Sequence, residues 1–402
     1  MPSLLVVGAG LAGLRAVEGA RQAGWSGPIT IVGDEPYPPY DRPPLSKAAL
    51  SSEEEPGVPV LRSSEVIEEL RVHHLSGVRV HGLDTERRTV TTSAGDLGYD
   101  ALVIATGSTA TTLPGLSGVR GVQVLRRYDD ALAVRDSLAR SRRVVIVGAG
   151  FIGSEIASAA RARGIEVIVV EASSRPLERA VGPLAAARLM QLHTDAGVRL
   201  LTRTTVSGVR TLRQAQDIGS DRGVDEVELS TGETVAADAV VLGIGARPAT
   251  TWLAGSGVAL DNRTGGVLCD RRLATSAPGV WAAGDVACVD GERSEHWTAA
   301  GEQGRVAGAN AAGATEVFAS VPFAWSTWHG HRIQVVGETT AADEEEREAG
   351  FIVYRRGGIE VGAVGIDNPG PVARLRRTLA AQAPSETRAH TALAGGVVPA
   401  RE

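Results

Sequence analysis

Short, fully apolar runs that are followed at once by glycine recur along the chain. The runs Leu4–Val7 and Val144–Val147 are continuous rather than alternating, a pattern typical of strands buried on both faces of a parallel sheet. Each run leads through a glycine-rich turn into a stretch with helical spacing, and then into a second apolar run, Ile29–Val32 or Val167–Val170. The pattern predicts two strand–helix–strand units.

The turns after both first strands carry glycines at the spacing Gly-x-Gly-x-x-Gly, namely Gly8, Gly10, Gly13, Gly148, Gly150 and Gly153. Glycine lets the backbone approach a pyrophosphate, and the N-terminus of the following helix stabilises its negative charge. One such unit alone has a second interpretation, a structural strand–helix–strand that binds nothing. Two complete units predict two bound dinucleotides.

Acidic residues follow the second strand of each unit, where a carboxylate can accept hydrogen bonds from ribose hydroxyls. Asp34 and Glu35 end the first unit and Glu171 ends the second. An acid at this place repels a 2′-phosphate, so Glu171 favours NADH over NADPH. Arg175 leaves NADPH open as the alternative, because its side chain could fold back onto a 2′-phosphate. The other role for Arg175 is that of a solvated loop residue.

Length and composition limit the class of protein. A chain of 402 residues predicts two or three domains, and the net charge of −6 argues against nucleic-acid binding. The sequence shows no signal peptide and no membrane-spanning run, so we expect a cytoplasmic protein without membrane contact. The two cysteines, Cys269 and Cys288, lack metal or redox spacing. We expect two small buried side chains and no metal site.

Further motifs occur in a fixed order: "YDALVIATGSTATTLPG" (99–115), "ADAVVLGIGARPAT" (237–250) and "TSAPGVWAAGDVACV" (275–289). This order resembles the two-dinucleotide flavoprotein reductases, in which FAD occupies the first fold and a nicotinamide nucleotide the second. The resemblance implies an α/β fold of two Rossmann-like, glutathione-reductase-like domains with a small α+β C-terminal domain. It also implies the boundaries, which are 1–112 with 244–320 for FAD, 113–243 for NAD, and 321–402 for the C-terminal domain.

The segment "YDRPPLSK" (40–47) narrows the resemblance. It stands where the disulfide-reducing members carry a redox-active cysteine pair, and it contains no cysteine. With "GFIGSE" (150–155), "LERAVGP" (177–183), "EHWTAAGEQG" (295–304) and "FAWSTWHGHRIQVVG" (323–337), it resembles the putidaredoxin reductase-like family of bacterial oxygenase systems.

This family implies that hydride passes from NADH to FAD and that electrons leave singly to an iron–sulfur ferredoxin, of the [2Fe–2S] type. The ferredoxin would serve a haem-thiolate or a Rieske oxygenase. Two alternatives remain open. One is a flavin-dependent NADH oxidase or small-molecule reductase, and the other is an NADH-responsive binding flavoprotein.

The resemblance also assigns residues to the two nucleotides. For FAD they are Gly8, Gly10, Ala12, Gly13, Asp34, Glu35, Arg42, Lys47, Val80, Ala105, Thr106, Gly107, Arg126, Gly284, Asp285 and Trp297. For the nicotinamide nucleotide they are Gly148, Gly150, Ile152, Gly153, Glu155, Glu171 and Gly245. Of the two acids after the first unit, Asp34 matches the ribose acid better.

Lys47 and Glu155 are the candidate catalytic residues. Lys47 would place a cation beside the flavin, where a positive charge stabilises the negative charge of the reduced ring. Glu155 would be its ion-pair partner. The alternative for Lys47 is a solvated loop lysine, and for Glu155 an ordinary acid on a helix face.

The C-terminal part departs from the family pattern, which usually reads Trp-Phe-Trp-Ser-Asp-Gln where this chain has "FAWSTWHG". His296 and His329 could tune the flavin, but packing or surface roles are the alternative. The run Asp343–Glu348 predicts a solvated turn. "ARLRRTL" predicts a helix carrying Arg374, Arg376 and Arg377, either to dock an acidic ferredoxin or as a plain solvated basic face.

Overall fold

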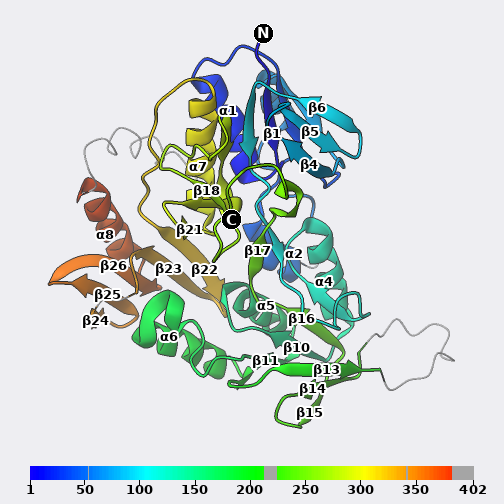
Figure 1. The fold of residues 1–402 in the computed structure, drawn as a ribbon. Coiled ribbons are helices and arrows are strands. Elements are labelled where there is room, and N and C mark those ends of the chain that lie inside the picture. Colours follow the sequence, from blue (N-terminus) through cyan, green and yellow to red (C-terminus); the bar gives the residue numbers. More distant parts are fainter. Residues whose placement is uncertain (53, 212–223, 341–342, 383–402) are drawn as a thin grey trace.

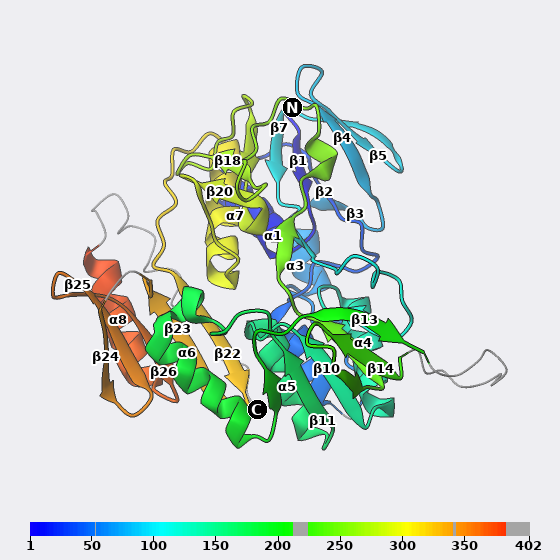
Figure 2. The ribbon, with the colours of Figure 1, turned by 60° about the horizontal axis from the view of Figure 1, so that its bottom comes forward.

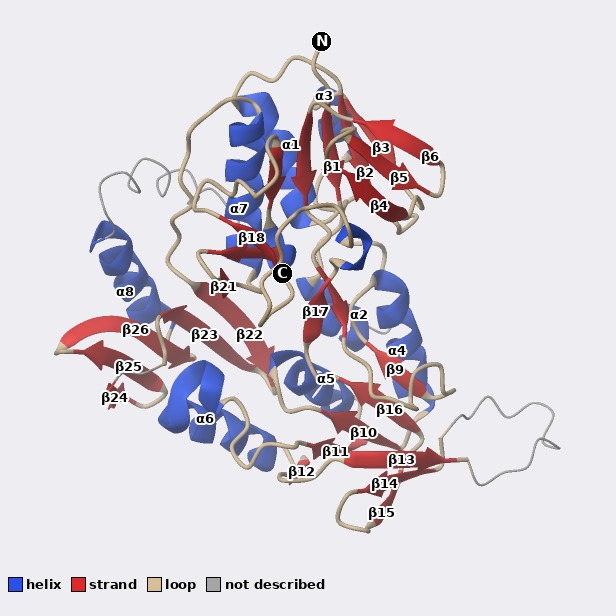
Figure 3. Ribbon diagram, in the orientation of Figure 1, coloured by secondary structure: helices blue, strands red, loops and turns tan. Residues whose placement is uncertain are grey.

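The computed structural model describes residues 1–52, 54–211, 224–340 and 343–382. Three larger sheets organise it, two of them parallel with flanking helices and one antiparallel (Figures 1 and 3). The architecture agrees with the predicted α/β class and its small α+β C-terminal part. The domain boundaries stay a prediction, and residues 383–402 of the third predicted domain lie outside the described residues.

The first sheet has the strand order β19-β7-β1-β2-β3 and is parallel throughout. Strand β1 (Leu4–Val7) is fully buried at its centre, next to β2 (Ile29–Val32), and both predicted strands are confirmed. On the other side β1 pairs with β7 (Ala101–Ile104), and β7 pairs with β19 (Val280–Ala282). Strand β3 (Val72–Leu75) completes the sheet. Segments that lie before and after the second strand–helix–strand unit therefore build one sheet.

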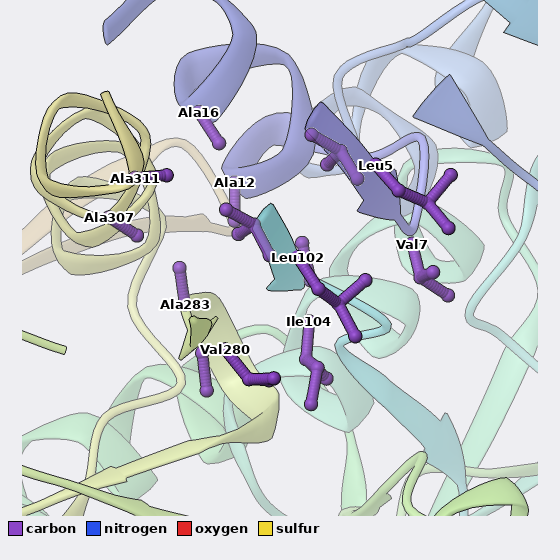
Figure 4. Close-up of a cluster of buried hydrophobic side chains, with 14 of the residues drawn as sticks. Leu5, Val7, Ala12, Ala16, Leu102, Ile104, Val280, Ala283, Ala307 and Ala311 are labelled. Carbon is purple, nitrogen blue, oxygen red and sulfur yellow. The ribbon is translucent and has the colours of Figure 1, made fainter. Parts of the chain in front are cut away.

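Small residues let two helices lie close together against this sheet. Helices α1 (Leu11–Gln22) and α7 (Trp297–Ala311) meet through alanines that Figure 4 shows beside the strands. A Cβ added at Gly308 would lie 1.9 Å from the carbonyl oxygen of Ala16, and one at Gly304 would lie 2.2 Å from that of Ala12. The high glycine content thus serves helix packing as well as turns.

Smaller antiparallel units surround the first sheet. Strands β4 (Val80–Asp84), β5 (Thr89–Thr92) and β6 (Gly95–Gly98) form one, and β18 (Val267–Cys269), β20 (Ala287–Val289) and β21 (Glu292–Arg293) form another with one parallel pair. Strands β8 (Ser108–Ala110) and β17 (Ala246–Pro248) pair in a two-stranded connection. Cys269 and Cys288 are buried as predicted, and they form no disulfide with each other.

The second parallel sheet has the order β12-β11-β10-β16-β9. Its strands are β9 (Val122–Val124), β10 (Arg143–Val147), β11 (Glu166–Val170), β12 (Arg199–Leu201) and β16 (Ala239–Leu242). Helix α5 (Phe151–Ala162) connects β10 to β11, which confirms the second predicted unit. Helix α4 (Tyr128–Arg140) and a meander of β13 (Val206–Arg210), β14 (Glu226–Leu229) and β15 (Thr234–Ala236) accompany it.

The third sheet is antiparallel, with order β22-β23-β26-β25-β24. It consists of β22 (Phe323–Trp328), β23 (His331–Gly337), β24 (Asp343–Glu348), β25 (Phe351–Arg356) and β26 (Ile359–Ile366), with α8 (Pro369–Gln382) packed on it. The solvated turn predicted for Asp343–Glu348 is wrong, because the segment is the edge strand β24. Its acids pair with arginines such as Arg188 and Arg355, and such charges protect an open edge.

Helix α6 (Glu178–Asp195) joins the third sheet to the second, as Figures 1 and 2 both show. The helix is kinked at Gly182, which has φ +71°, and Pro183 follows. Across this kink the carboxylate of Glu344 on β24 accepts a hydrogen bond of 2.7 Å from the Leu184 amide. The Tyr354 hydroxyl donates to the Val181 carbonyl. A side chain of the third sheet therefore caps a helix that belongs to the second.

Removing this cap should destabilise the protein. Glu344→Ala leaves the Leu184 amide without its acceptor, and we expect a loss of about 1–2 kcal/mol in the free energy of unfolding. Urea unfolding followed by circular dichroism measures it. The exposed Glu348 of the same strand supplies the control variant, Glu348→Ala. Equal losses in both variants would contradict the capping role.

Candidate active site

The first glycine turn forms a close-fitting cradle at the N-terminus of α1. A Cβ at Gly8, whose φ is +115°, would lie 2.1 Å from the Ala105 carbonyl oxygen, and one at Gly13 would lie 1.9 Å from that of Gly8. At Gly10, in contrast, an added Cβ would meet nothing within 4 Å. No side chain caps α1, so its first amides face this open place. The residues fit a pyrophosphate.

The second glycine turn repeats this geometry at the N-terminus of α5. A Cβ at Gly148, with φ +100°, would lie 2.5 Å from the Gly243 carbonyl oxygen, and one at Gly153 would lie 2.1 Å from that of Gly148. Gly150 again faces open space, and α5 also lacks a side-chain cap. The side chain of Ile152, two residues after Gly150, is 44% exposed, which is unusual for isoleucine. A nucleotide at this turn would cover it.

Glu171 lies beside the second turn. Its carboxylate accepts hydrogen bonds from the Ala149 amide at 2.9 Å and from the Ser173 amide at 2.7 Å. Arg175 is turned to Glu178, with 3.0 Å between guanidinium and carboxylate. In this structure the carboxylate, rather than the arginine, therefore borders the turn. Gly245, with φ +89°, ends the neighbouring loop.

The two acids after β2 have different partners. Asp34 pairs with Arg127 at 2.6 Å, and Glu35 pairs with Arg42 at 2.8 Å. Glu35 also accepts a hydrogen bond of 2.6 Å from the Tyr40 hydroxyl. Arg42 donates on to the Arg126 carbonyl at 2.6 Å, so this predicted residue joins two segments of the first nucleotide site. Which acid holds the ribose stays a prediction.

Asp285 and Arg126 form an ion pair of 2.8 Å. Asp285 lies in the short 3-10 helix η3 (Gly284–Val286), directly after β19. The Ser108 hydroxyl donates to the same carboxylate oxygen at 3.0 Å, and the Arg126 guanidinium donates to the Ser108 carbonyl at 2.9 Å. The sequence reasoning missed Ser108. Its place directly after the glycine of the "ATG" turn was the available signal.

The remaining predicted flavin-site residues are spread around the first sheet. The Trp297 indole, at the start of α7, donates to Asp41 at 2.6 Å and meets the Trp325 ring edge-on at 5.7 Å. The Thr106 hydroxyl donates to the Ala249 carbonyl at 2.9 Å. Ala105 and Ala12 are buried, and Val80 begins β4. A Cβ added at Gly107 would lie 3.5 Å from the Arg126 guanidinium, and one added at Gly284 would lie 2.9 Å from the Cβ of Ala12.

The predicted catalytic pair is present. The Lys47 ammonium lies 2.7 Å from Glu155 Oε1, and the Glu155 side chain is only 3% exposed. Two hydroxyls also donate to this carboxylate, that of Ser46 to Oε2 and that of Ser326 to Oε1. The ion pair is confirmed, and the structure adds the two serines. Sequence reasoning assigned a role to neither serine; Ser46 and Ser326 lie 109 and 171 positions from Glu155.

A buried histidine lies behind this carboxylate. His193 is fully buried on α6, and its Nε2 lies 2.9 Å from the Ser154 hydroxyl. Its Nδ1 lies 3.0 Å from Nε2 of His329, and its ring stacks on Trp328 at 5.4 Å. Burial, followed by the neighbouring His329, lowers the pKa of His193 to about 4. His329 therefore has a packing role here, one of the two predicted alternatives.

The lowered pKa of His193 should make stability depend on pH. An unfolded chain protonates this residue below its ordinary pKa of 6.5, whereas the folded protein does so only near 4. Stability contributed by His193 is thus present at pH 7 and lost as the pH falls, by about 2 kcal/mol between pH 7 and pH 5. The charged or titratable group that faces the His193 ring is His329. Burial, and then the nearby Arg161 and His331, lower the pKa of His329 as well.

Urea unfolding of wild type and His193→Gln at both pH values measures this loss. The variant should show a smaller decrease in free energy than wild type, and His73→Gln, which changes an exposed histidine, should match wild type. The same pH dependence in all three proteins would argue against the assignment.

The basic stretch near the C-terminus is helical, as predicted. Arg374 and Arg377 are exposed on α8, and the Arg376 guanidinium lies 4.3 Å from the centre of the Phe323 ring. Burial lowers the pKa of Arg376. Docking of an acidic partner here stays a prediction.

Two parallel sheets, each with a glycine cradle at a helix N-terminus, are the arrangement of a protein that binds two nucleotides. The family model described as pyridine nucleotide-disulphide oxidoreductase matches residues 2–304, and the chain belongs to this family. The two cysteines of the chain lie on β18 and β20. The Lys47 loop therefore contains no cysteine pair for the disulphide reduction that the family's description names. The family and its relatives support a flavin and NAD as the nucleotides.

The chain is 36% identical to rhodocoxin reductase of Rhodococcus erythropolis, over 85% of this chain and 79% of that protein. It is also 36% identical to the benzene 1,2-dioxygenase system ferredoxin–NAD(+) reductase subunit of Pseudomonas putida, over 84% and 81%. The structure is similar to the reductase of the covalent putidaredoxin reductase–putidaredoxin complex, with a TM-score of 0.86, 29% identity and coverage of 94% and 93%. Among the described helices, none has the length and apolar character that crossing a membrane requires.

Proposed function

We propose that this protein is an NADH-dependent ferredoxin reductase with FAD in the first cradle and NADH in the second. The acceptor is a [2Fe–2S] ferredoxin that serves a haem-thiolate or Rieske oxygenase, and the protein acts in the cytoplasm. The observation that carries the proposal is the Lys47–Glu155 ion pair, which joins the loop after the first cradle to the helix that begins at the second. The relatives in oxygenase systems support the choice of acceptor.

A flavin held at the first cradle would supply the hydride-accepting and one-electron-donating chemistry that links NADH to an iron–sulfur carrier. The chain's own residues supply position and charge. Lys47 provides a cation beside the reacting ring, and a fixed cation stabilises negative charge without reorganisation during the reaction. Glu155 holds Lys47 in place. Arg126 and Ser108 orient the carboxylate of Asp285, which would accept hydrogen bonds from the flavin side chain.

The acceptor can be tested by stopped-flow absorbance. The flavin-loaded protein is reduced by NADH without air and is then mixed with a [2Fe–2S] ferredoxin or with air-saturated buffer. We expect reoxidation by the ferredoxin to be much faster than by air, because one-electron carriers match the proposed chemistry. Fast reoxidation by air with none by ferredoxin would favour an NADH oxidase. Slow reoxidation by both would favour an NADH-responsive binding protein.

The choice of nicotinamide nucleotide tests the role of Glu171. Like charges about 4 Å apart repel by about 1 kcal/mol or more, so reduction at subsaturating nucleotide should be at least about fivefold faster with NADH than with NADPH. Glu171→Gln should reduce this preference, and Glu166→Gln, which changes an exposed acid at the start of the preceding strand β11, should keep it. A wild-type preference for NADPH would refute the assignment.

A further inference from the structure

Ser326 connects the catalytic pair to a buried tryptophan. The serine lies on β22 with no exposed surface, and its hydroxyl donates to Glu155 Oε1. The same serine oxygen accepts a hydrogen bond of 2.7 Å from the indole Nε1–H of Trp328. Trp328 is also fully buried. Trp328, Ser326, Glu155 and Lys47 thus form one continuous chain of polar contacts.

The direction of this chain follows from the chemistry of its ends. An indole N–H can only donate, an ammonium can only donate, and a serine hydroxyl has one hydrogen. Because Trp328 donates to Ser326, the serine hydrogen is free to be given to Glu155. Lys47 gives its hydrogen to the same carboxylate oxygen. The arrangement therefore suits a carboxylate that accepts from all its neighbours.

Trp328 itself cannot turn easily. One face of its ring stacks on His193, at 5.4 Å with 21° between the planes, and Phe151 contacts it at 5.5 Å. Phe151 is the first residue of α5, directly after the second glycine turn. Close packing fixes the indole and so fixes the point from which its N–H is donated.

We propose that Ser326, oriented by Trp328, is a positioning residue for the Lys47–Glu155 pair. Trp328 fixes the serine hydroxyl, the hydroxyl fixes the Glu155 carboxylate, and the carboxylate fixes the ammonium of Lys47. This inference rests on the proposed function, because it assigns a purpose to holding Lys47 still beside the flavin. The competing explanation is that Ser326 is only a buried hydroxyl with its hydrogen bonds satisfied.

A first test needs no nucleotide turnover. In the flavin-loaded protein labelled with ¹⁵N-tryptophan, Trp328→Phe identifies the Trp328 indole signal by its loss. We expect Ser326→Ala to shift this signal and to speed its exchange with solvent. Ser46→Ala is the matched control, since Ser46 contacts the other oxygen of the same carboxylate, and it should leave the signal unchanged. An unchanged signal in Ser326→Ala would overturn the inference.

A second test measures flavin reduction by NADH in single turnovers. A hydrogen bond to a charged group supports a decrease of about tenfold or more in the rate constant for Ser326→Ala, with the NADH concentration at half-saturation unchanged. Trp328→Phe keeps an aromatic ring but removes the N–H, and it should slow the reaction in the same direction. Thermal unfolding shows that each variant is folded.

A double-mutant cycle separates positioning from packing. If Ser326 acts through the pair, Ser326→Ala should have no further effect on the reduction rate of Lys47→Ala. Effects that multiply, or a Ser326→Ala variant that reduces as fast as wild type, would overturn the inference alone. A wild-type protein that NADH does not reduce would overturn both the inference and the proposed function.

Discussion

The buried carboxylate of Glu155 is the constraint on which the rest of the structure depends. A charge that is almost fully removed from water costs several kcal/mol unless it is paired and hydrogen-bonded. Its partners come from two separate parts of the chain: Lys47 and Ser46 from the loop after the first cradle, and Ser326 from β22. Glu155 itself lies on the helix of the second cradle. The first, second and third sheets must therefore all be in place before this one side chain is satisfied.

The local sequence pattern was enough to predict the elements whose structure depends on residues close together in the sequence. Continuous apolar runs with a following glycine predicted the strands at Leu4–Val7 and Val144–Val147, because a strand buried in a parallel sheet can be recognised without knowing its partners. The run Asp343–Glu348 was misjudged for the converse reason. Acidic residues occupy both faces of this run, so it lacks the alternation of apolar and polar residues that marks a strand. The arginines that pair with its acids lie on other elements, and they become visible only in the folded chain.

The site was predictable where a residue stands in a motif, and not where a distant residue completes it. The pairing of Lys47 with Glu155 was correctly expected, although 108 positions separate the two residues. Ser326 coincides with the serine of the family pattern, whereas Trp328 stands where that pattern has glutamine, and the sequence alone did not show what either side chain contacts. Their roles depend on how β22 packs against α5, which no local pattern encodes.

The proline-rich loop shows how local stiffness serves this distant contact. Pro43 begins a short 3-10 helix, η1 (Pro43–Ser46), and Lys47 follows it with its amide bonded to the Pro44 carbonyl at 3.1 Å. Fixed φ values reduce the entropy that the loop loses on ordering. The consecutive residues Ser46 and Lys47 then reach the two different oxygens of one carboxylate. A flexible loop would lose more conformational entropy when both residues bind the carboxylate. The prolines reduce this loss and so favour the contact.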